Sequence, residues 1–358
     1  MNLVDLLPVL LAAVALYGCD MSPLRSGTLH ASSLTPEASN HLRGLFVIAV
    51  VYHHIYQMVG CGILFPIFTR VGFLCVGFFF FISGYGLMKR HTADAAYHKS
   101  FLRKRIPAVL LPFTLDNVIY WLFHLLRGTN YSALDFFYGV ARGEPIAANS
   151  WYIISLLVCY LFFWCSVRLF RNRPGMVVLS NVLLCVVYTG ACIGLGYGSE
   201  WFKSIAAYPM GLLWALCEAP VLERIKKTWL LWLAAAAVLL GGSMLAQMLY
   251  GNLSAPAVTQ AIISNLTIIF FISCLVLVVM KIRLGNRLLA HLGKLSLEIY
   301  LYHGMFLILA RPLLTGPDRA FVYFLAVLSG TLVFAHLVRP LGQLLLKAWR
   351  RIPVHTSR

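Results

Sequence analysis

The feature that most constrains this chain is a succession of apolar runs of about twenty residues, separated by short loops that hold most of the charge. Runs of this length can cross the hydrocarbon core of a bilayer as helices. We place ten of them after a first, shorter apolar segment. The sequence therefore predicts an all-α, polytopic membrane helix bundle. The ten expected spans are residues 42–60, 71–88, 106–126, 151–170, 176–197, 202–217, 229–250, 261–280, 296–314 and 320–341.

The composition agrees with a bilayer as the solvent. Hydrophobic residues make up 60% of the chain and charged residues only 11%, which is more apolar than a water-facing surface tolerates. A net charge of +17 would suggest nucleic acid as the partner of a soluble protein. Here the basic residues stand between runs too long for a globular core. We therefore interpret them as topology signals and expect no nucleic-acid partner.

The basic residues are distributed unequally between the two sides of the expected bundle. When the loops alternate between sides, 23 of the 29 Lys and Arg residues fall on one side, and every loop of that side contributes. By the positive-inside rule these loops and the C-terminus are cytoplasmic, which predicts a multi-pass protein of the cell inner membrane. The opposite side holds only Arg70, Arg127, Arg142, Lys203, Arg311 and Arg319.

Three regions follow from this pattern. Residues 1–20 form an extra N-terminal hydrophobic segment that lacks the basic start of a secretory signal, so we expect a short membrane segment running from outside to inside. Residues 40–345 form the membrane domain, and 346–358 a basic cytoplasmic tail. The nine cysteines lack C-x-x-C spacing, which argues against a disulfide framework or a zinc site, and no metal site is expected.

The first long span carries the sharpest polar pair, Arg43 and His54, eleven residues apart. Eleven steps of about 100° return almost to the starting azimuth and rise roughly 16 Å, so one helix face carries both groups. His53 is turned about 100° from that face. One hypothesis is a track in which Arg43 holds a cytoplasmic anion and His54 acts as general base. The other is a snorkelling arginine with hydrogen-bonded histidines, and spacing alone does not separate the two.

Two further segments carry candidate groups. Ser83 and Gly84 stand among phenylalanines and allow a helix or a ligand to approach closely, although packing alone also explains them. The basic cluster at Arg103, Lys104 and Arg105 lies where a span enters the membrane. Such a cluster can hold a phosphate-rich ligand, but setting the topology is its default role.

The ninth span contains a polar stripe. Ser296, Tyr300 and His303 have offsets of zero, four and seven, which places them on one helix face. Glu298 lies about 160° from Ser296, so we expect it to face another helix and to need a cationic partner. Three hydrogen-bonding groups on one face exceed what lipid exposure permits, so this stripe favours a functional interior.

Together these segments resemble the acyltransferase 3 family of bacterial membrane acyltransferases, from about residue 40 to at least residue 303. The family often has a second arginine three residues after the position of Arg105, where this chain has Ala108. The matching pieces are Leu42-Arg43-Gly44 through His54, the Phe-rich run into Ser83-Gly84-Tyr85, Phe101 through Arg105 with Pro112, Ser150-Trp151-Tyr152, and Gly293-Lys294 through His303.

The resemblance implies transfer of an acyl group, most often acetyl, from cytoplasmic acyl-CoA to a hydroxyl of a carbohydrate or lipid-linked glycan at the outer face. No permanently bound cofactor is expected, because acyl-CoA is a substrate. The resemblance assigns His54 and Arg43 to catalysis, and Arg43, Lys104 and Arg105 to the donor phosphates. Candidates for stabilising the oxyanion or contacting the acceptor are Ser83, Tyr300, His303, Glu298 and Trp151.

Two alternatives remain open. A transporter or flippase for a glycolipid or small anion would also place polar residues inside the membrane. A sensor that binds acyl-CoA without chemistry would need Arg43 but not His54, so the presence of both on one face favours catalysis. Within the transferase hypothesis, direct transfer is simpler than a covalent relay through Ser83 or His54.

Overall fold

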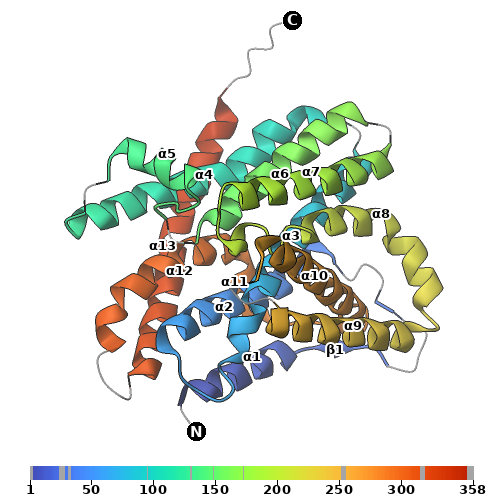
Figure 1. The fold of residues 1–358 in the computed structure, drawn as a ribbon, viewed down its shortest axis with the longest axis horizontal. Helices are drawn as coiled ribbons and strands as arrows, with labels where there is room; N and C mark the ends of the chain where they lie inside the picture. Colours follow the sequence, from blue (N-terminus) through green and yellow to red (C-terminus); the bar gives the residue numbers. More distant parts are fainter. Residues whose placement is uncertain are drawn as a thin grey trace, which may run out of the picture.

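The computed structural model describes residues 3–23, 29–30, 34–94, 96–129, 131–147, 149–171, 173–250, 255–314 and 319–352. Over these residues the chain is a bundle of helices with one two-stranded sheet (Figure 1). The elements are η1 Leu3–Asp5, α1 Leu6–Leu16, β1 Asp20–Met21, α2 Pro36–Val59, α3 Ile67–Ala93, α4 Tyr97–Leu126, α5 Ala133–Ala141, α6 Trp151–Leu169, α7 Pro174–Gly194, η2 Ser199–Trp201, α8 Ala207–Ile225, α9 Trp229–Tyr250, α10 Ala257–Val279, β2 Ile282–Arg283, α11 Arg287–Lys294, α12 Ser296–Leu309, η3 Arg311–Leu314 and α13 Ala320–Arg351.

The helices confirm the predicted all-α membrane bundle. Among the described residues, eight helices are long and apolar enough to cross a membrane, and α11 with α12, bent by 75°, makes a ninth. The remaining expected span, 202–217, differs most from the structure. Its helix, α8, begins at Ala207 and continues to Ile225. The shift arises because Phe202 to Ala206 forms turns after η2, while the polar residues Glu218 and Glu223 are helical.

We call the side with the α3–α4, α6–α7 and α8–α9 connections the basic side, because it holds most of the Lys and Arg residues. The C-terminal end of α13 lies there beside the start of α4, where the Trp349 indole donates to the Arg103 carbonyl and the Arg103 guanidinium donates to the Ile352 carbonyl. Within the predicted tail, 346–351 continues α13, and 353–358 lies outside the described residues, as does Arg25.

Helix α2 lies in the core of the bundle. Thr35 caps its first turn by accepting a hydrogen bond from the Ala38 amide at 3.1 Å, and Pro36 fits the first helical position. It packs against α11 so closely that a Cβ on Gly44 would lie 2.1 Å from the Leu289 carbonyl oxygen, and one on Gly293 1.8 Å from that of Asn40. The two helices therefore meet backbone to backbone.

The extra N-terminal segment contacts both ends of the bundle. Its Asp5 carboxylate binds the α2–α3 loop on the side opposite the basic side. Its other end reaches the basic side, where β1 pairs antiparallel with β2, Asp20 opposite Arg283. Asn286 also donates to the Val14 carbonyl at 3.0 Å, and buried Lys281 donates to that of Pro23 at 2.8 Å. These bonds join the segment to the rest of the bundle.

The contact between α2 and α11 leads to a stability prediction. Gly293→Ala adds a methyl group that would clash with the Asn40 carbonyl oxygen. Overpacking of this kind lowers the free energy of unfolding by about 1–3 kcal/mol. Gly241→Ala in α9 is the matched control, since a Cβ there meets nothing within 4 Å. We expect Gly293→Ala to lower the thermal unfolding temperature of the detergent-solubilised protein and Gly241→Ala to leave it unchanged or higher. Equal unfolding temperatures for both variants would contradict the close contact.

Candidate active site

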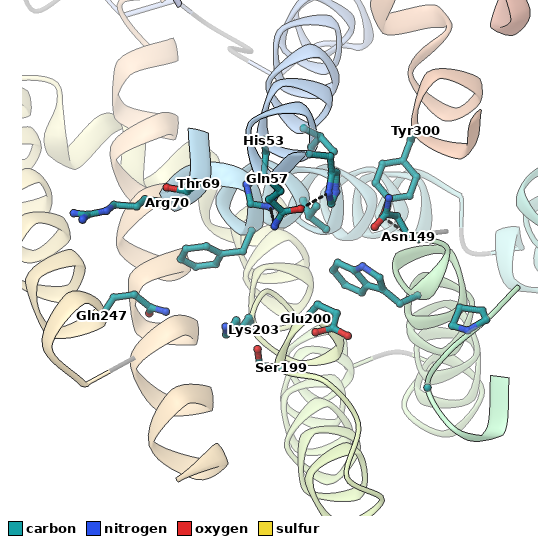
Figure 2. A pocket seen from close by; sticks show the side chains of 18 of the residues that line it. His53, Gln57, Thr69, Arg70, Asn149, Ser199, Glu200, Lys203, Gln247 and Tyr300 are labelled. Atoms are coloured by element: carbon teal, nitrogen blue, oxygen red, sulfur yellow. Dashed lines mark hydrogen bonds between the residues drawn. The ribbon is translucent and has the colours of Figure 1, made fainter. Parts of the chain in front are cut away.

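A cavity of about 810 Å³ opens between the helices on the side opposite the basic side. Figure 2 shows His53 and Gln57 near Asn149 and Tyr300, with Ser199, Glu200 and Lys203 across from them. Its walls come from α2, α3, α6, α9 and α12, and from the segments 143–149 and 199–203. Segments far apart in the sequence therefore contribute to one concave, polar site.

Two adjacent histidines of α2 line this cavity and share one glutamine. The His54 Nδ1 lies 3.0 Å from the Gln57 Oε1, and the Gln57 Nε2 lies 3.2 Å from the His53 Nε2. The His53 Nδ1 lies 2.8 Å from the Phe68 carbonyl oxygen. The cavity therefore includes His53 as well as His54, although the two rings lie about 100° apart on the helix, because Gln57 on the next turn bridges both rings.

These partners decide which ring nitrogens carry hydrogen. The Phe68 carbonyl only accepts, so His53 carries its hydrogen on Nδ1 and receives one from Gln57 at Nε2. The reverse orientation of the Gln57 amide would require a second proton on His53. We therefore assign the hydrogen of His54 to Nδ1, bonded to the Gln57 oxygen, which leaves a lone pair on its Nε2. That atom has the properties of a general base facing a cavity.

A third histidine stands behind this pair. The ring centroids of His54 and His303 are 5.0 Å apart. Buried His303 donates from Nδ1 to the Tyr300 carbonyl at 2.7 Å, and its Nε2 lies 3.3 Å from the Asn149 Nδ2. The Tyr300 hydroxyl in turn donates to the Asn149 carbonyl at 2.7 Å. Of the predicted stripe on α12, Tyr300 and His303 thus lie at the site.

The opposite wall of the cavity carries charges of both signs. Arg70 places its Nη1 2.7 Å from the Met248 sulfur, and Lys203 lies near Glu200. Burial lowers the pKa of Lys203 from its ordinary value, while the Glu200 carboxylate acts in the opposite direction. Glu144 supplies a second carboxylate to the lining. A ligand there meets two cations, two carboxylates and the Trp151 ring.

The loop from Arg127 to Ser150 closes one rim of the cavity. Its apolar part is the short helix α5, whose Val140 and Ala141 carbonyls accept from the Tyr197 hydroxyl at 3.2 and 2.8 Å. The Trp201 indole donates to the Gly143 carbonyl at 3.1 Å. These bonds hold the segment that brings Gly143, Glu144 and Pro145 to the cavity. This loop therefore supplies part of the cavity rim.

Nearer the basic side, two arginines from different helices meet. Arg43 of α2 and Arg105 of α4 are near enough to repel each other, and both interact with the Tyr160 hydroxyl. The Arg105 guanidinium also lies 5.7 Å from the centre of the Tyr160 ring. Its Nε is buried with no hydrogen-bond partner among the described residues. Two cations within electrostatic range of each other, with no carboxylate paired to either among the described residues, have the charge that suits an anion.

Tyr152 connects the arginine pair to the cavity. It interacts electrostatically with Arg43, forms a hydrogen bond with Ser83 and has its ring centroid 5.1 Å from that of Tyr300. Tyr152, Tyr300, His303 and His54 therefore form a continuous series of ring contacts, and Arg43 interacts electrostatically with Tyr152 at its start. The series leads from the basic half of the bundle to the cavity.

The other sequence candidates lie in different surroundings. Lys104 is exposed and turned about 100° from Arg105, so it does not join the arginine pair. Ser83 hydrogen-bonds Tyr152 and does not line the cavity. Glu298 lies within electrostatic range of Arg339 of α13 but forms no ion pair among the described residues, and it is likewise absent from the lining. Trp151 lines the cavity as a candidate acceptor contact.

Two residues of the histidine network, Gln57 and Asn149, were missed by sequence reasoning, as were the charged residues of the opposite wall. Gln57 follows His53 by four residues and His54 by three, so the helical spacing that selected His54 also held the signal for its partner. Asn149 had a weaker signal, an asparagine directly before the Ser150-Trp151 pair. Its left-handed backbone, with φ of 64°, carries its amide and carbonyl to α12.

The left-handed Asn149 leads to a second prediction. Alanine at a left-handed position costs about 1–2 kcal/mol, a cost that glycine avoids. Asn149→Ala and Asn149→Gly both lose the hydrogen bond to His303. The difference in stability between the two variants therefore reports the cost of the left-handed backbone at position 149. We expect Asn149→Ala to unfold at a lower temperature than Asn149→Gly in a thermal melt. If Asn149→Ala is the more stable variant, the left-handed conformation is wrong.

Comparison with known proteins agrees with this geometry. A family model described as an acyltransferase domain, Acyl_transf_3, matches residues 37–339, which contain every residue of the histidine network and the arginine pair. No curated protein and no solved structure matches the chain. The match covers most of the 358 residues, and the helices form a multi-pass membrane bundle. The chain therefore belongs to the acyltransferase 3 family of membrane acyltransferases.

Proposed function

We propose that this membrane acyltransferase moves an acyl group, most simply acetyl, from acyl-CoA to a hydroxyl of a carbohydrate or lipid-linked glycan. One observation carries the proposal: α2 places Arg43 beside Arg105 at one end and His54 in the cavity at the other. Eleven helical residues separate the two by roughly 16 Å along the axis. The same helix thus carries a candidate anion-binding residue, Arg43, and a candidate general base, His54.

The donor is proposed to bind from the basic side, which we infer to be cytoplasmic in the inner membrane. Phosphate oxygens of acyl-CoA suit the Arg43 and Arg105 pair, because guanidinium groups form paired, charge-assisted hydrogen bonds with phosphate. The acyl-bearing arm would then follow the contacts of Tyr152 and Tyr300 towards His54. This placement supports a donor that enters from the basic side and reacts at the cavity on the opposite side of the bundle.

The proposed reaction balances without a cofactor. His54 Nε2 removes the proton of the acceptor hydroxyl while that oxygen attacks the thioester carbonyl carbon. The carbon–sulfur bond then breaks, CoA leaves as the thiolate, and the imidazolium returns the proton to sulfur. The Gln57 oxygen holds the Nδ1 hydrogen of His54 throughout and so favours the imidazolium. Ser83 does not line the cavity, which favours direct transfer over a relay through its hydroxyl.

The cavity supports a hydroxyl-rich acceptor. Its charged lining of Arg70, Lys203, Glu144 and Glu200 is balanced in sign, and its amide and hydroxyl groups offer further donors and acceptors of hydrogen bonds. Trp151 adds an aromatic surface suited to the apolar face of a sugar ring. A neutral carbohydrate satisfies these groups better than an apolar molecule does.

The base assignment leads to a third prediction. With purified protein, acetyl-CoA and a panel of glycan acceptors, His54→Ala and His54→Gln are expected to lower acceptor-dependent CoA release by about 10²–10⁴-fold, the usual contribution of a general base. His336→Ala is the control, since that histidine lies outside the cavity lining. Full turnover in folded His54→Ala would exclude the base assignment. Absence of both acetyl-CoA binding and turnover in the native protein would favour a transporter.

The donor assignment leads to a fourth prediction. Arg105→Met is expected to weaken acetyl-CoA binding by about tenfold or more, since a charge-assisted bond to phosphate is worth about 1.5–3 kcal/mol. Lys104→Met removes the same charge from the adjacent, exposed position and is expected to change binding far less. Equilibrium binding of radiolabelled acetyl-CoA measures both variants. Equal losses would mean that the surface charge, and not the half-buried pair of Arg43 and Arg105, holds the donor.

A further inference from the structure

Asp5 of the extra N-terminal segment binds the loop that joins the two helices of the site. Its Oδ1 accepts hydrogen bonds from three successive backbone amides, those of Ile63 at 2.7 Å, Leu64 at 2.8 Å and Phe65 at 3.3 Å. The side chain is buried, with 1% of its surface exposed. A carboxylate that receives three amides is a strong, charge-assisted anchor.

The loop is shaped to receive this carboxylate. Gly62 has a φ of +108°, and a Cβ there would lie 2.7 Å from the Asp5 Oδ1 and 3.3 Å from a methyl carbon of Val4. Val4 is itself fully buried. A side chain at position 62 and the Asp5 carboxylate therefore exclude each other, so the fit between segment and loop depends on both residues.

The same loop determines where Phe68 lies. It connects the end of α2 at Val59 to the start of α3 at Ile67, one residue before Phe68. The Phe68 carbonyl holds His53, and Gln57 passes that constraint to His54. Four links thus separate the Asp5 carboxylate from the proposed base: the amides, the Phe68 carbonyl, the His53 ring and the Gln57 amide.

We propose that Asp5 is a positioning residue, which fixes the orientation and the hydrogen assignment of His54 by holding the α2–α3 loop. The segment that supplies it precedes the matched residues 37–339, so the site receives part of its support from outside the family domain. When the carboxylate is lost, the loop relaxes, His53 leaves Phe68, and Gln57 is free to turn its amide. The consequence for catalysis rests on the proposed function, but the structural link does not.

The structural link is tested without any activity assay, by the rate at which diethyl pyrocarbonate modifies each histidine, read by peptide mass spectrometry. Both ring nitrogens of His53 are occupied, while His54 keeps a free Nε2, so native His54 should react faster than His53. We expect Asp5→Ala to raise the rate at His53 several-fold and to bring the two rates together. His336 is the internal reference.

Three further variants make the result specific. Asp5→Asn keeps the accepting oxygen and is expected to preserve the native ratio, as is Asp20→Ala, which removes an exposed carboxylate of the same segment. Asp5→Ser, whose hydroxyl is one bond shorter, replaces Asp5→Ala if that variant fails to fold. An unchanged ratio of His53 to His54 modification in a folded Asp5→Ala or Asp5→Ser variant would overturn the proposal.

The catalytic consequence has its own readout. Asp5→Ala is expected to lower kcat for acetyl transfer with little change in the KM for acetyl-CoA, because the arginine pair lies at the other end of α2, and Asp5→Asn is expected to restore kcat. If His54→Ala also leaves transfer intact, the proposed function is wrong while the labelling result still decides the role of Asp5. If His54→Ala abolishes transfer and Asp5→Ala does not lower kcat, the positioning role is wrong.

Discussion

The site depends on a contact in which one helix backbone meets another. Helix α2 carries both the arginine and the histidines, and its depth is set where Gly44 meets Leu289 and Gly293 meets Asn40. Because carbonyl oxygens and not side chains form this contact, small changes of rotamer cannot absorb a displacement. The α11 helix on the other side of the contact bends by 75° into α12, which carries Tyr300 and His303. The same contact therefore aligns the two halves of the histidine network.

Within the bilayer this network is satisfied only as a set of neutral groups. Each imidazole donates from Nδ1 to a carbonyl or amide oxygen, and each amide in turn donates to an imidazole. Because the Gln57 amide both donates and accepts within the network, its orientation constrains its neighbours. The arginine pair is the complementary case, in which two charges meet without an anion among the described residues. The histidine network thus satisfies its own hydrogen bonds, while the arginine pair keeps a net positive charge that the proposed donor phosphates would neutralise.

Much of this arrangement could be predicted from the sequence, for physical reasons. The apolar runs follow from the thickness of the bilayer, and the Arg43 and His54 pair follows from the pitch of a helix. Helical spacing alone did not show that His53 belongs to the site. Gln57 connects His53 and His54 although their side chains point in different directions from the helix. The basic cluster on α4 could not be divided into half-buried Arg105 and exposed Lys104 without the neighbouring Tyr160 of α6. Contacts between distant segments, such as Asp5 with Ile63, leave no local pattern at all.

The pairing of β1 with β2 has a consequence for the order of biosynthesis. Asp20 meets Arg283, so the partner of the first segment leaves the ribosome only after more than 260 further residues. At about 5–20 residues per second, that interval is roughly 13–53 s. During this time α2 and α3 are already made, while the segment that supports their connecting loop has no strand to pair with on the basic side. The end of the first segment on the basic side is therefore among the last parts of the molecule to reach its final form, and a chain truncated before β2 would lack that pairing.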